Sequence, residues 1–127
     1  MSAIQVLLLI FGLFIVYTYT KRILVNRSVV HYSADETKER VKNNRNVILL
    51  DVRTPSERKQ QQIKGSIHIP LYEIEKRASE LEKFKDKEII CYCRSGNRSV
   101  TAAAKLKKKG FNSANMKGGI IRWNFNK

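Results

Sequence analysis

The sequence has only two cysteines and two histidines, and this scarcity excludes two classes of small protein. Cys91 and Cys93 are separated by one residue, a spacing that does not suit a secreted scaffold held together by disulfides. The pair instead indicates a reducing compartment, where thiols remain thiols. His31 and His68 lie far from each other and from the cysteines. Because no metal-ligand spacing results, we predict no structural zinc site and no cofactor.

Charged residues are absent from the first part of the chain. All 25 basic and 11 acidic residues lie at Lys21 or later, so the formal net charge of +14 belongs to the remainder. Such an excess suits an anionic partner, and it suits a solvated basic surface equally well. The sequence has no known nucleic-acid motif and no interleaving of aromatic and basic residues. We therefore expect no nucleic-acid partner.

The uncharged stretch from Ala3 to Thr20 predicts a transmembrane helix. At about 1.5 Å per residue it is roughly 27 Å long, close to the hydrocarbon thickness of a bilayer. Tyr17 and Tyr19 fall where an aromatic belt is expected, and basic residues begin directly afterwards at Lys21. The positive-inside rule then places the following domain in the cytoplasm, with the chain anchored in the cell membrane.

These patterns divide the chain into a transmembrane helix over residues 1–20, a basic juxtamembrane linker over 21–28 and a folded domain over 29–127. Two alternatives to the anchor are weaker. A cleaved signal peptide would need a basic start and a small-residue cleavage site, which are not visible here. A buried core helix would rarely be apolar on every side in so small a domain.

The remainder of the chain alternates between strand and helix patterns. Helices are expected to start at Ser33, which opens a capping box with Glu36, at Pro55, at Leu71 and near Val100. The apolar spacing from Leu71 predicts one helix that continues to Phe84. Strands are expected at Val29–His31, Val47–Leu50, Ile67–Ile69, Glu88–Tyr92 and Ala114–Met116. This alternation predicts an α/β fold with a mainly parallel open sheet flanked by helices.

The residues that follow two of these strands are candidates for chemistry, because parallel sheets bind ligands beyond the carboxyl ends of their strands. One strand ends at Asp51, and the other ends at Cys93. Cys93 precedes a basic loop that leads directly into a helix, whose unpaired N–H groups favour an anion. Arg94 and Arg98 add positive charge, so we expect Cys93 to be a nucleophilic thiolate.

Cys91 lies within the apolar run of the same strand. We expect it to be a packed core residue. The alternative is that Cys91 shares a face with Cys93, because strand side chains alternate, and resolves a persulfide by forming a disulfide.

With these residues in view, the sequence resembles the rhodanese-like family. The resemblance runs from about Val29 to Asn126, and the active-site and Leu-Asp-Val-Arg stretches in this order are highly specific together. The matching stretches are Leu50–Arg53, Thr54–Glu57, Ile63–Pro70, Cys91–Ser99, Gly118–Ile120 and Trp123. In one departure, Gln61-Gln62 stands where the family often has Gly-His, and we expect this to change packing without loss of activity.

The resemblance implies a sulfurtransferase of the thiosulfate type, in which Cys93 accepts a sulfane sulfur as a persulfide and passes it to a nucleophile. It implies that the loop binds the substrate through Arg94, Ser95, Gly96, Asn97, Arg98 and Ser99. Arg94 is the candidate for anions such as thiosulfate, and Arg98 ties the loop to the scaffold. Asp51 and Arg53 support the site from the neighbouring strand, although Arg53 could instead simply pair with Glu57.

Two other functions remain open. A phosphatase of the same fold would have one more residue in the loop, whereas residues 93–98 form a loop of the shorter kind, which favours sulfur transfer. A tethered sulfur carrier, redox sensor or scaffold would use the same cysteine without turnover. The expected partners are a small anionic sulfur donor, a thiol, cyanide or protein acceptor, and the membrane.

Overall fold

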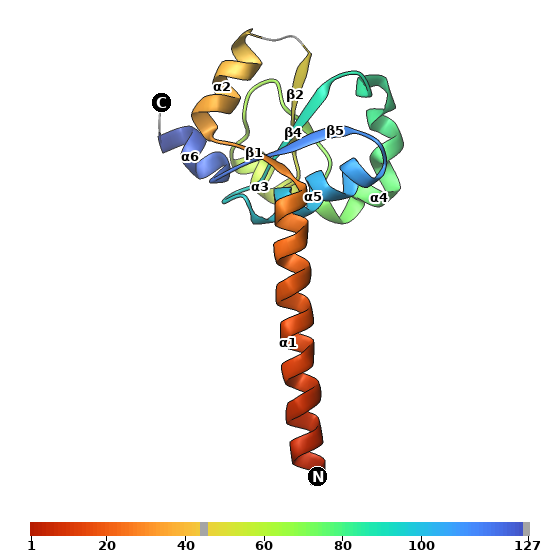
Figure 1. Cartoon of the computed structure of the whole chain (residues 1–127). Helices are drawn as coiled ribbons and strands as arrows, with labels where there is room; N and C mark the ends of the chain where they lie inside the picture. The colour runs from red at the N-terminus through yellow and green to blue at the C-terminus, as the bar shows by residue number, and fades with distance from the viewer. Residues whose placement is uncertain (44–45, 126–127) are drawn as a thin grey trace.

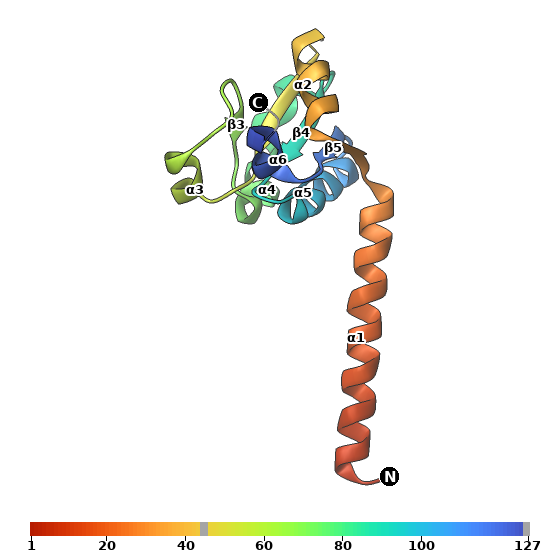
Figure 2. The ribbon, with the colours of Figure 1, turned by 90° about the vertical axis from the view of Figure 1, so that its left-hand side faces the viewer.

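The computed structural model describes residues 1–43 and 46–125, so the last two residues of the predicted domain lie outside the described part. One long helix, α1 (Ala3–Ser28), projects away from an α/β domain (Figures 1 and 2). It begins with a capping box between Ser2 and Gln5, and none of its residues is buried. Within the described residues it is the one helix long and apolar enough to cross a membrane. Residues 21–28, assigned to a linker from the sequence, continue this helix.

The domain is built on a parallel sheet, as the sequence predicts. Its strands lie in the order β1-β5-β4-β2-β3. Their bounds are β1 Val30–Tyr32, β2 Val47–Asp51, β3 Ile67–His68, β4 Glu88–Tyr92 and β5 Asn112–Met116. The two central strands, β4 and β2, are apolar on both faces, because helices cover both sides of the sheet.

Helices pack in two layers on the sheet. On one face, α4 (Ile74–Arg77) and α5 (Asn97–Lys108) cover a cluster that includes Leu50, Ile89 and Cys91. On the other face, α2 (Ala34–Asn43) and α6 (Gly119–Phe125) cover a cluster that includes Leu49 and Ile90. A short helix, α3 (Pro55–Gln60), follows β2. The predicted α/β class is therefore confirmed.

The segment Leu71–Phe84 differs from the prediction of one continuous helix. A 3₁₀ helix, η1 (Leu71–Glu73), precedes α4, and a second one, η2 (Ala78–Phe84), follows it. The spacing explains the difference, since Ala78, Leu81 and Phe84 recur every third residue. A 3₁₀ helix has three residues per turn, so this pattern lines up on one of its faces.

The end of α1 is attached to the domain rather than free. Val25 packs against the same core cluster as Val29, which is buried. Lys107 Nζ donates a hydrogen bond to the carbonyl oxygen of Ser28 at 2.6 Å. A histidine of β1, His31, reaches back to the Asn26 carbonyl oxygen, with 2.8 Å between Nε2 and the oxygen. The long helix thus meets the domain through specific polar contacts.

Candidate active site

The ends of β2 and β4 bring the predicted site residues to one edge of the sheet. The parallel register places Asp51 beside Tyr92, so Cys93 follows directly at the same level. The Val52 N–H donates to the Tyr92 carbonyl oxygen at 3.0 Å and extends the pairing past both strand ends. The segments after the two strands therefore start side by side.

The loop after β4 folds around the sulfur of Cys93. The Gly96 N–H donates to Cys93 Sγ at 3.0 Å, and Ser99 Oγ lies 3.3 Å from the same sulfur. Gly96 has a φ of 104°, in the left-handed region that favours glycine, and it forms the N-cap of α5. The turn at Gly96 is therefore what directs an amide toward the sulfur.

A second segment supports this loop from behind. The N–H groups of Ile120 and Ile121, in the first turn of α6, donate to the carbonyl oxygens of Cys93 and Arg94 at 2.9 and 3.3 Å. A Cβ at Gly119, which has a φ of 58°, would overlap these two carbonyl oxygens. Glycine is therefore required here for the close approach of the two backbones.

The two loop arginines have different environments. Arg98 forms a two-pronged ion pair with Glu57, with nitrogen–oxygen distances of 2.6 and 2.9 Å. The hydrogen bond from Arg98 lowers the pKa of Glu57 to about 2. Arg94 is exposed and lines a hollow of about 700 Å³ together with Arg53 and Glu57. Arg98 thus ties the loop to α3, whereas Arg94 faces solvent beside the site.

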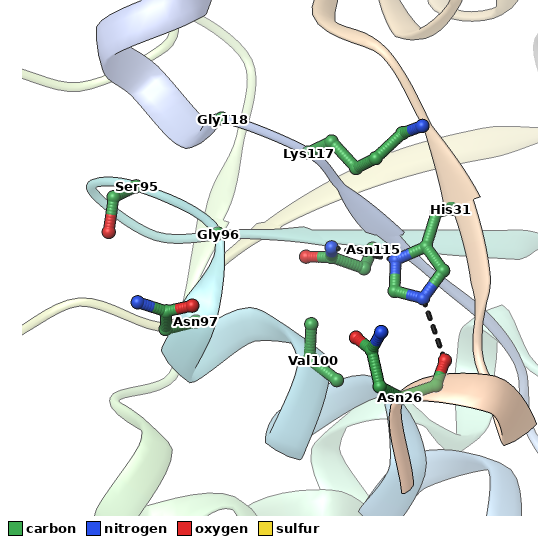
Figure 3. Close-up of a pocket in the computed structure, with 9 residues that line it drawn as sticks. All are labelled: Asn26, His31, Ser95, Gly96, Asn97, Val100, Asn115, Lys117 and Gly118. Atoms are coloured by element: carbon green, nitrogen blue, oxygen red, sulfur yellow. Dashed lines mark hydrogen bonds between the residues drawn. The ribbon is translucent and has the colours of Figure 1, made fainter. Parts of the chain in front are cut away.

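Other loop residues line a second hollow. Ser95 and Asn97 are exposed there, and they line a space of about 430 Å³ with His31 and Asn115 (Figure 3). Ser99 is fully buried in the first turn of α5. Different residues of the loop therefore border two open spaces, whereas Cys93 itself is buried and is not among the lining residues of either.

Asp51 and Arg53 form a buried ion pair beneath the site. Arg53 Nε and Nη2 donate to the two carboxylate oxygens of Asp51 at 2.9 and 2.8 Å, and Arg58 adds a contact at 3.2 Å. Burial alone would raise the pKa of Asp51, but the hydrogen bonds from Arg53 and Arg58 outweigh it and lower that pKa. The alternative that Arg53 pairs with Glu57 is wrong, because Glu57 binds Arg98 instead.

Cys91 shares the face of Cys93 but not its polar partners. Both thiols are free, and Cys91 is fully buried in the apolar cluster beneath α5. Burial raises the pKa of the Cys91 thiol, which keeps it protonated and unreactive. In the part of the chain that the structure describes, no group of three or more acidic, histidine or cysteine side chains is arranged to hold a metal ion.

Three contacts of the site were missed in the sequence. Arg58 supports Asp51, and Asn115 accepts a hydrogen bond from Ser99 at 2.5 Å, while His31 contacts Asn115 in turn. Arg58 is a surface-type residue in a short polar helix, and His31 and Asn115 are far apart in the chain. No local pattern marks such residues, because only the strand order brings them together.

Comparison with known proteins agrees with this geometry. A family model described as "Rhodanese-like domain" matches residues 33–126, which is most of the chain. The chain belongs to the rhodanese-like domain family. This assignment confirms the resemblance drawn from the Cys93 loop and the Leu50–Arg53 stretch.

Two relatives align with this chain over most of their length. A sulfurtransferase of Allochromatium vinosum is 37% identical over 91 residues, which are 71% of this chain and 83% of that protein. The crystal structure of a rhodanese-related protein from Thermoplasma volcanium superposes with a TM-score of 0.69 at 33% identity, over 76% of this chain and 92% of that one. The rhodanese fold is therefore shared throughout the domain.

A third relative extends into the amino-terminal helix. The Bacillus subtilis protein YqhL, whose name states no activity, is 32% identical over 120 residues, which are 94% of this chain and 91% of that protein. An alignment of this extent includes most of the apolar stretch Ala3–Thr20. The similarity to this relative is therefore not confined to the rhodanese-like domain.

Proposed function

We propose that the chain is a membrane-anchored sulfurtransferase that carries sulfane sulfur as a persulfide on Cys93. The observation that carries this proposal is the hydrogen bond from the Gly96 N–H to Cys93 Sγ at 3.0 Å, because an amide donor favours an anionic sulfur. Rhodanese-type sulfur transfer is supported further by the relative from Allochromatium vinosum, which is named a sulfurtransferase.

In the proposed reaction the Cys93 thiolate attacks the outer sulfur of a donor such as thiosulfate. A new S–S bond forms at Cys93, and the S–S bond of the donor breaks, so sulfite leaves with the electron pair. An acceptor, either cyanide or a thiolate, then attacks the outer sulfur of the persulfide, and Cys93 leaves as the thiolate. No net oxidation is needed, and the thiolate is restored after each cycle.

The surroundings of the loop suit an anionic donor. Arg94 is exposed at the rim of the 700 Å³ hollow, where its guanidinium can bind the sulfonate end of thiosulfate by paired hydrogen bonds. Ser95, Gly96 and Asn97 line the 430 Å³ hollow, and in this proposal they contact the donor as it approaches the loop. In this proposal Asp51, Arg53 and Arg98 hold the scaffold of the loop and do not touch the substrate.

The anchor is the second part of the proposal. Helix α1 is long and apolar enough to span a bilayer, and its side chains are exposed in the structure, as lipid contact requires. Lys21, Arg22 and Arg27 lie at the end nearest the domain. By the positive-inside rule this end and the domain are cytoplasmic. The sulfur-carrying cysteine would then work at the inner membrane surface.

Mass spectrometry tests the persulfide directly. The full-length protein, purified in detergent, is incubated with thiosulfate and compared with Cys93→Ser and with Cys91→Ala. We expect a gain of one sulfur atom in the parent and in Cys91→Ala, with no gain in Cys93→Ser. Equal gain in all three proteins, or cleavage of an aryl phosphate in place of sulfur uptake, would contradict the proposal.

Membrane extraction and protease protection test the anchor. We expect the protein to stay in the membrane pellet at alkaline pH, and its domain to be cleaved in inverted vesicles but protected in right-side-out ones. Deletion of residues 1–20 should release the domain into the soluble fraction. Protein that is extracted at alkaline pH, or that is cleaved from the outside, would reject the proposed topology.

A further inference from the structure

A continuous chain of polar contacts leads from the sulfur of Cys93 to the backbone of α1. Ser99 Oγ lies 3.3 Å from Cys93 Sγ and 2.5 Å from Asn115 Oδ1. Asn115 Nδ2 lies 3.1 Å from His31 Nδ1, and His31 Nε2 lies 2.8 Å from the carbonyl oxygen of Asn26. Figure 3 shows the last part of this chain, with His31 between Asn115 and the end of α1.

The strand register explains why these residues meet. His31 in β1 and Asn115 in β5 are direct partners in the parallel register. Ser99 is fully buried in the first turn of α5, and Asn115 is 2% exposed. Buried polar groups of this kind must satisfy their hydrogen-bonding capacity internally, so the orientation of one member determines that of the next.

The direction of each hydrogen bond follows from the Asn26 carbonyl oxygen, at which this series of contacts ends. The Asn26 carbonyl can only accept, so His31 carries its hydrogen on Nε2 and accepts at Nδ1. The amide nitrogen of Asn115 therefore donates to His31, and its oxygen faces Ser99. Ser99 gives its single hydroxyl hydrogen to Asn115 and turns a lone pair toward Cys93. This arrangement favours the thiol, which can donate to Ser99, over the thiolate.

The opposite arrangement is available to the same side chains. If Asn26 withdraws, solvent can remove the hydrogen from Nε2 of His31 and return one to Nδ1, with no net change in protons. His31 then donates to Asn115, whose amide turns over and donates to Ser99. The Ser99 hydroxyl hydrogen is free to point at the Cys93 thiolate and stabilise it.

We propose that Asn115 and His31 are positioning residues that direct the hydroxyl hydrogen of Ser99, and so set the thiolate fraction of Cys93 according to whether the end of α1 is docked. This inference rests on the proposed role of Cys93 as the sulfur carrier. In this proposal the contact between α1 and the domain controls the reactivity of the Cys93 thiol, in addition to attaching the domain to the membrane.

The test is the pH profile of alkylation by iodoacetamide, measured on the full-length protein in detergent. All proteins carry Cys91→Ala, so that Cys93 is the one thiol followed by mass spectrometry. In Asn115→Ala the Ser99 hydrogen has lost its acceptor and turns to the sulfur. We expect the midpoint of the profile to fall by about one pH unit, with a roughly tenfold faster reaction below the midpoint.

A second substitution separates the relay from a general loosening of the fold. In a Ser99→Ala background there is no hydroxyl to redirect, so Asn115→Ala should leave the midpoint unchanged. The matched control is Ser113→Ala. Ser113 lies in β5 like Asn115, and the substitution removes its buried hydrogen bond of 2.6 Å to the Ala103 carbonyl oxygen. An equal shift with and without Ser99, or an equal shift in Ser113→Ala, would overturn the proposal.

The link to α1 has its own variant. Lys107→Met removes the hydrogen bond to the Ser28 carbonyl and loosens the end of α1, whereas Lys108→Met removes the same charge at the next position. We expect the midpoint to fall in Lys107→Met alone, and only when Ser99 is present. Equal profiles for the two lysine variants would overturn the link. Alkylation needs no sulfur donor, so these outcomes are distinguishable from a failure of sulfur transfer.

Discussion

The strand interior around Cys91 and the loop that follows Cys93 are two residues apart, yet they place different hydrogen-bonding groups around the two thiols. Their burial does not separate them, since Cys91 is 0% and Cys93 is 1% exposed. Both thiols belong to the same apolar cluster, and the difference lies in polar contacts, because the Gly96 N–H donates a hydrogen bond to the sulfur of Cys93. We therefore expect the reactivity of the two thiols to be set by the direction of nearby N–H and O–H groups and not by exposure.

The largest expected effect is the loss of turnover on substitution of one cysteine but not the other. Cys93→Ser should lower the rate of sulfur transfer from thiosulfate to cyanide by on the order of 10³-fold or more, because the sulfur acceptor is removed. Cys91→Ala should change this rate by less than about threefold, since a small apolar residue replaces a packed thiol. Comparable losses of rate in both variants would contradict the assignment of sulfur transfer to Cys93 and not to Cys91.

The next effect tests how closely the loop depends on its support from α6. Gly119→Ala would push a Cβ into the carbonyl oxygens of Cys93 and Arg94, so the loop must move away from the sulfur. We expect the transfer rate to fall roughly 100-fold, as for an ångström-scale misplacement of a reacting group. Gly65→Ala is the control, because it also has positive φ but open space around its Cβ. A similar loss of rate in Gly65→Ala would mean that backbone strain at positive φ lowers the rate, and not the overlap with the Cys93 loop.

Folding stability gives the third contrast. Cys91→Ser places a hydroxyl in an apolar cluster, and we expect the free energy of unfolding to fall by about 1–3 kcal/mol. Cys91→Ala is the matched variant without the hydroxyl, and it should lose less. Urea titration of both proteins measures the difference. If the serine variant were as stable as the alanine variant, the surroundings of Cys91 would have to be more polar than the structure indicates.

The smallest effect concerns the ion pair that ties the Cys93 loop to α3. The pKa of Glu57 is lowered from 4.5 to about 2 in the folded protein by the hydrogen bond from Arg98, so the unfolded chain binds the proton more tightly. This contribution to stability is present above about pH 4.5 and disappears as the pH falls toward 2. Glu57→Gln should therefore lose less stability than the parent between pH 5 and about pH 3.

Melting temperatures measured across this range check the prediction, and Glu82→Gln is the control. Glu82 is an exposed glutamate whose contact with Lys85 is 3.3 Å long, outside the loop. The parent and Glu82→Gln should show the same acid dependence. If Glu57→Gln follows the same curve as the parent, the Arg98 pair contributes nothing to holding the loop.

Local sequence signals predicted most of the elements. The capping box expected at Ser33 is formed, the helix expected at Pro55 begins there behind a capping box at Thr54, and the apolar runs of β2 and β4 lie at the centre of the sheet. The apolar residues of the Leu71–Phe84 segment are three or four positions apart, and this spacing predicts one α-helix. The last three of them are each three positions apart, which suits a 3₁₀ helix equally well. Both 3₁₀ and α geometries satisfy such a short pattern.

The site was predictable only where it is local. Cys93, Gly96 and Arg98 lie on one short loop, so their relation to a helix start is visible in the chain. The partners that orient them come from elsewhere: Glu57 from α3, Asn115 from β5 and His31 from β1. Their pairing depends on strand order and register, and a single sequence without the fold does not contain that information.

The support that α6 gives to the Cys93 loop has a consequence for which substitutions the loop tolerates. The hydrogen bonds to the carbonyl groups of Cys93 and Arg94 come from the backbone N–H groups of Ile120 and Ile121. Every residue except proline supplies such a group, so this support does not depend on which side chain stands at either position. A proline at position 120 or 121 would remove one of the two hydrogen bonds and leave a carbonyl oxygen of the loop without its donor.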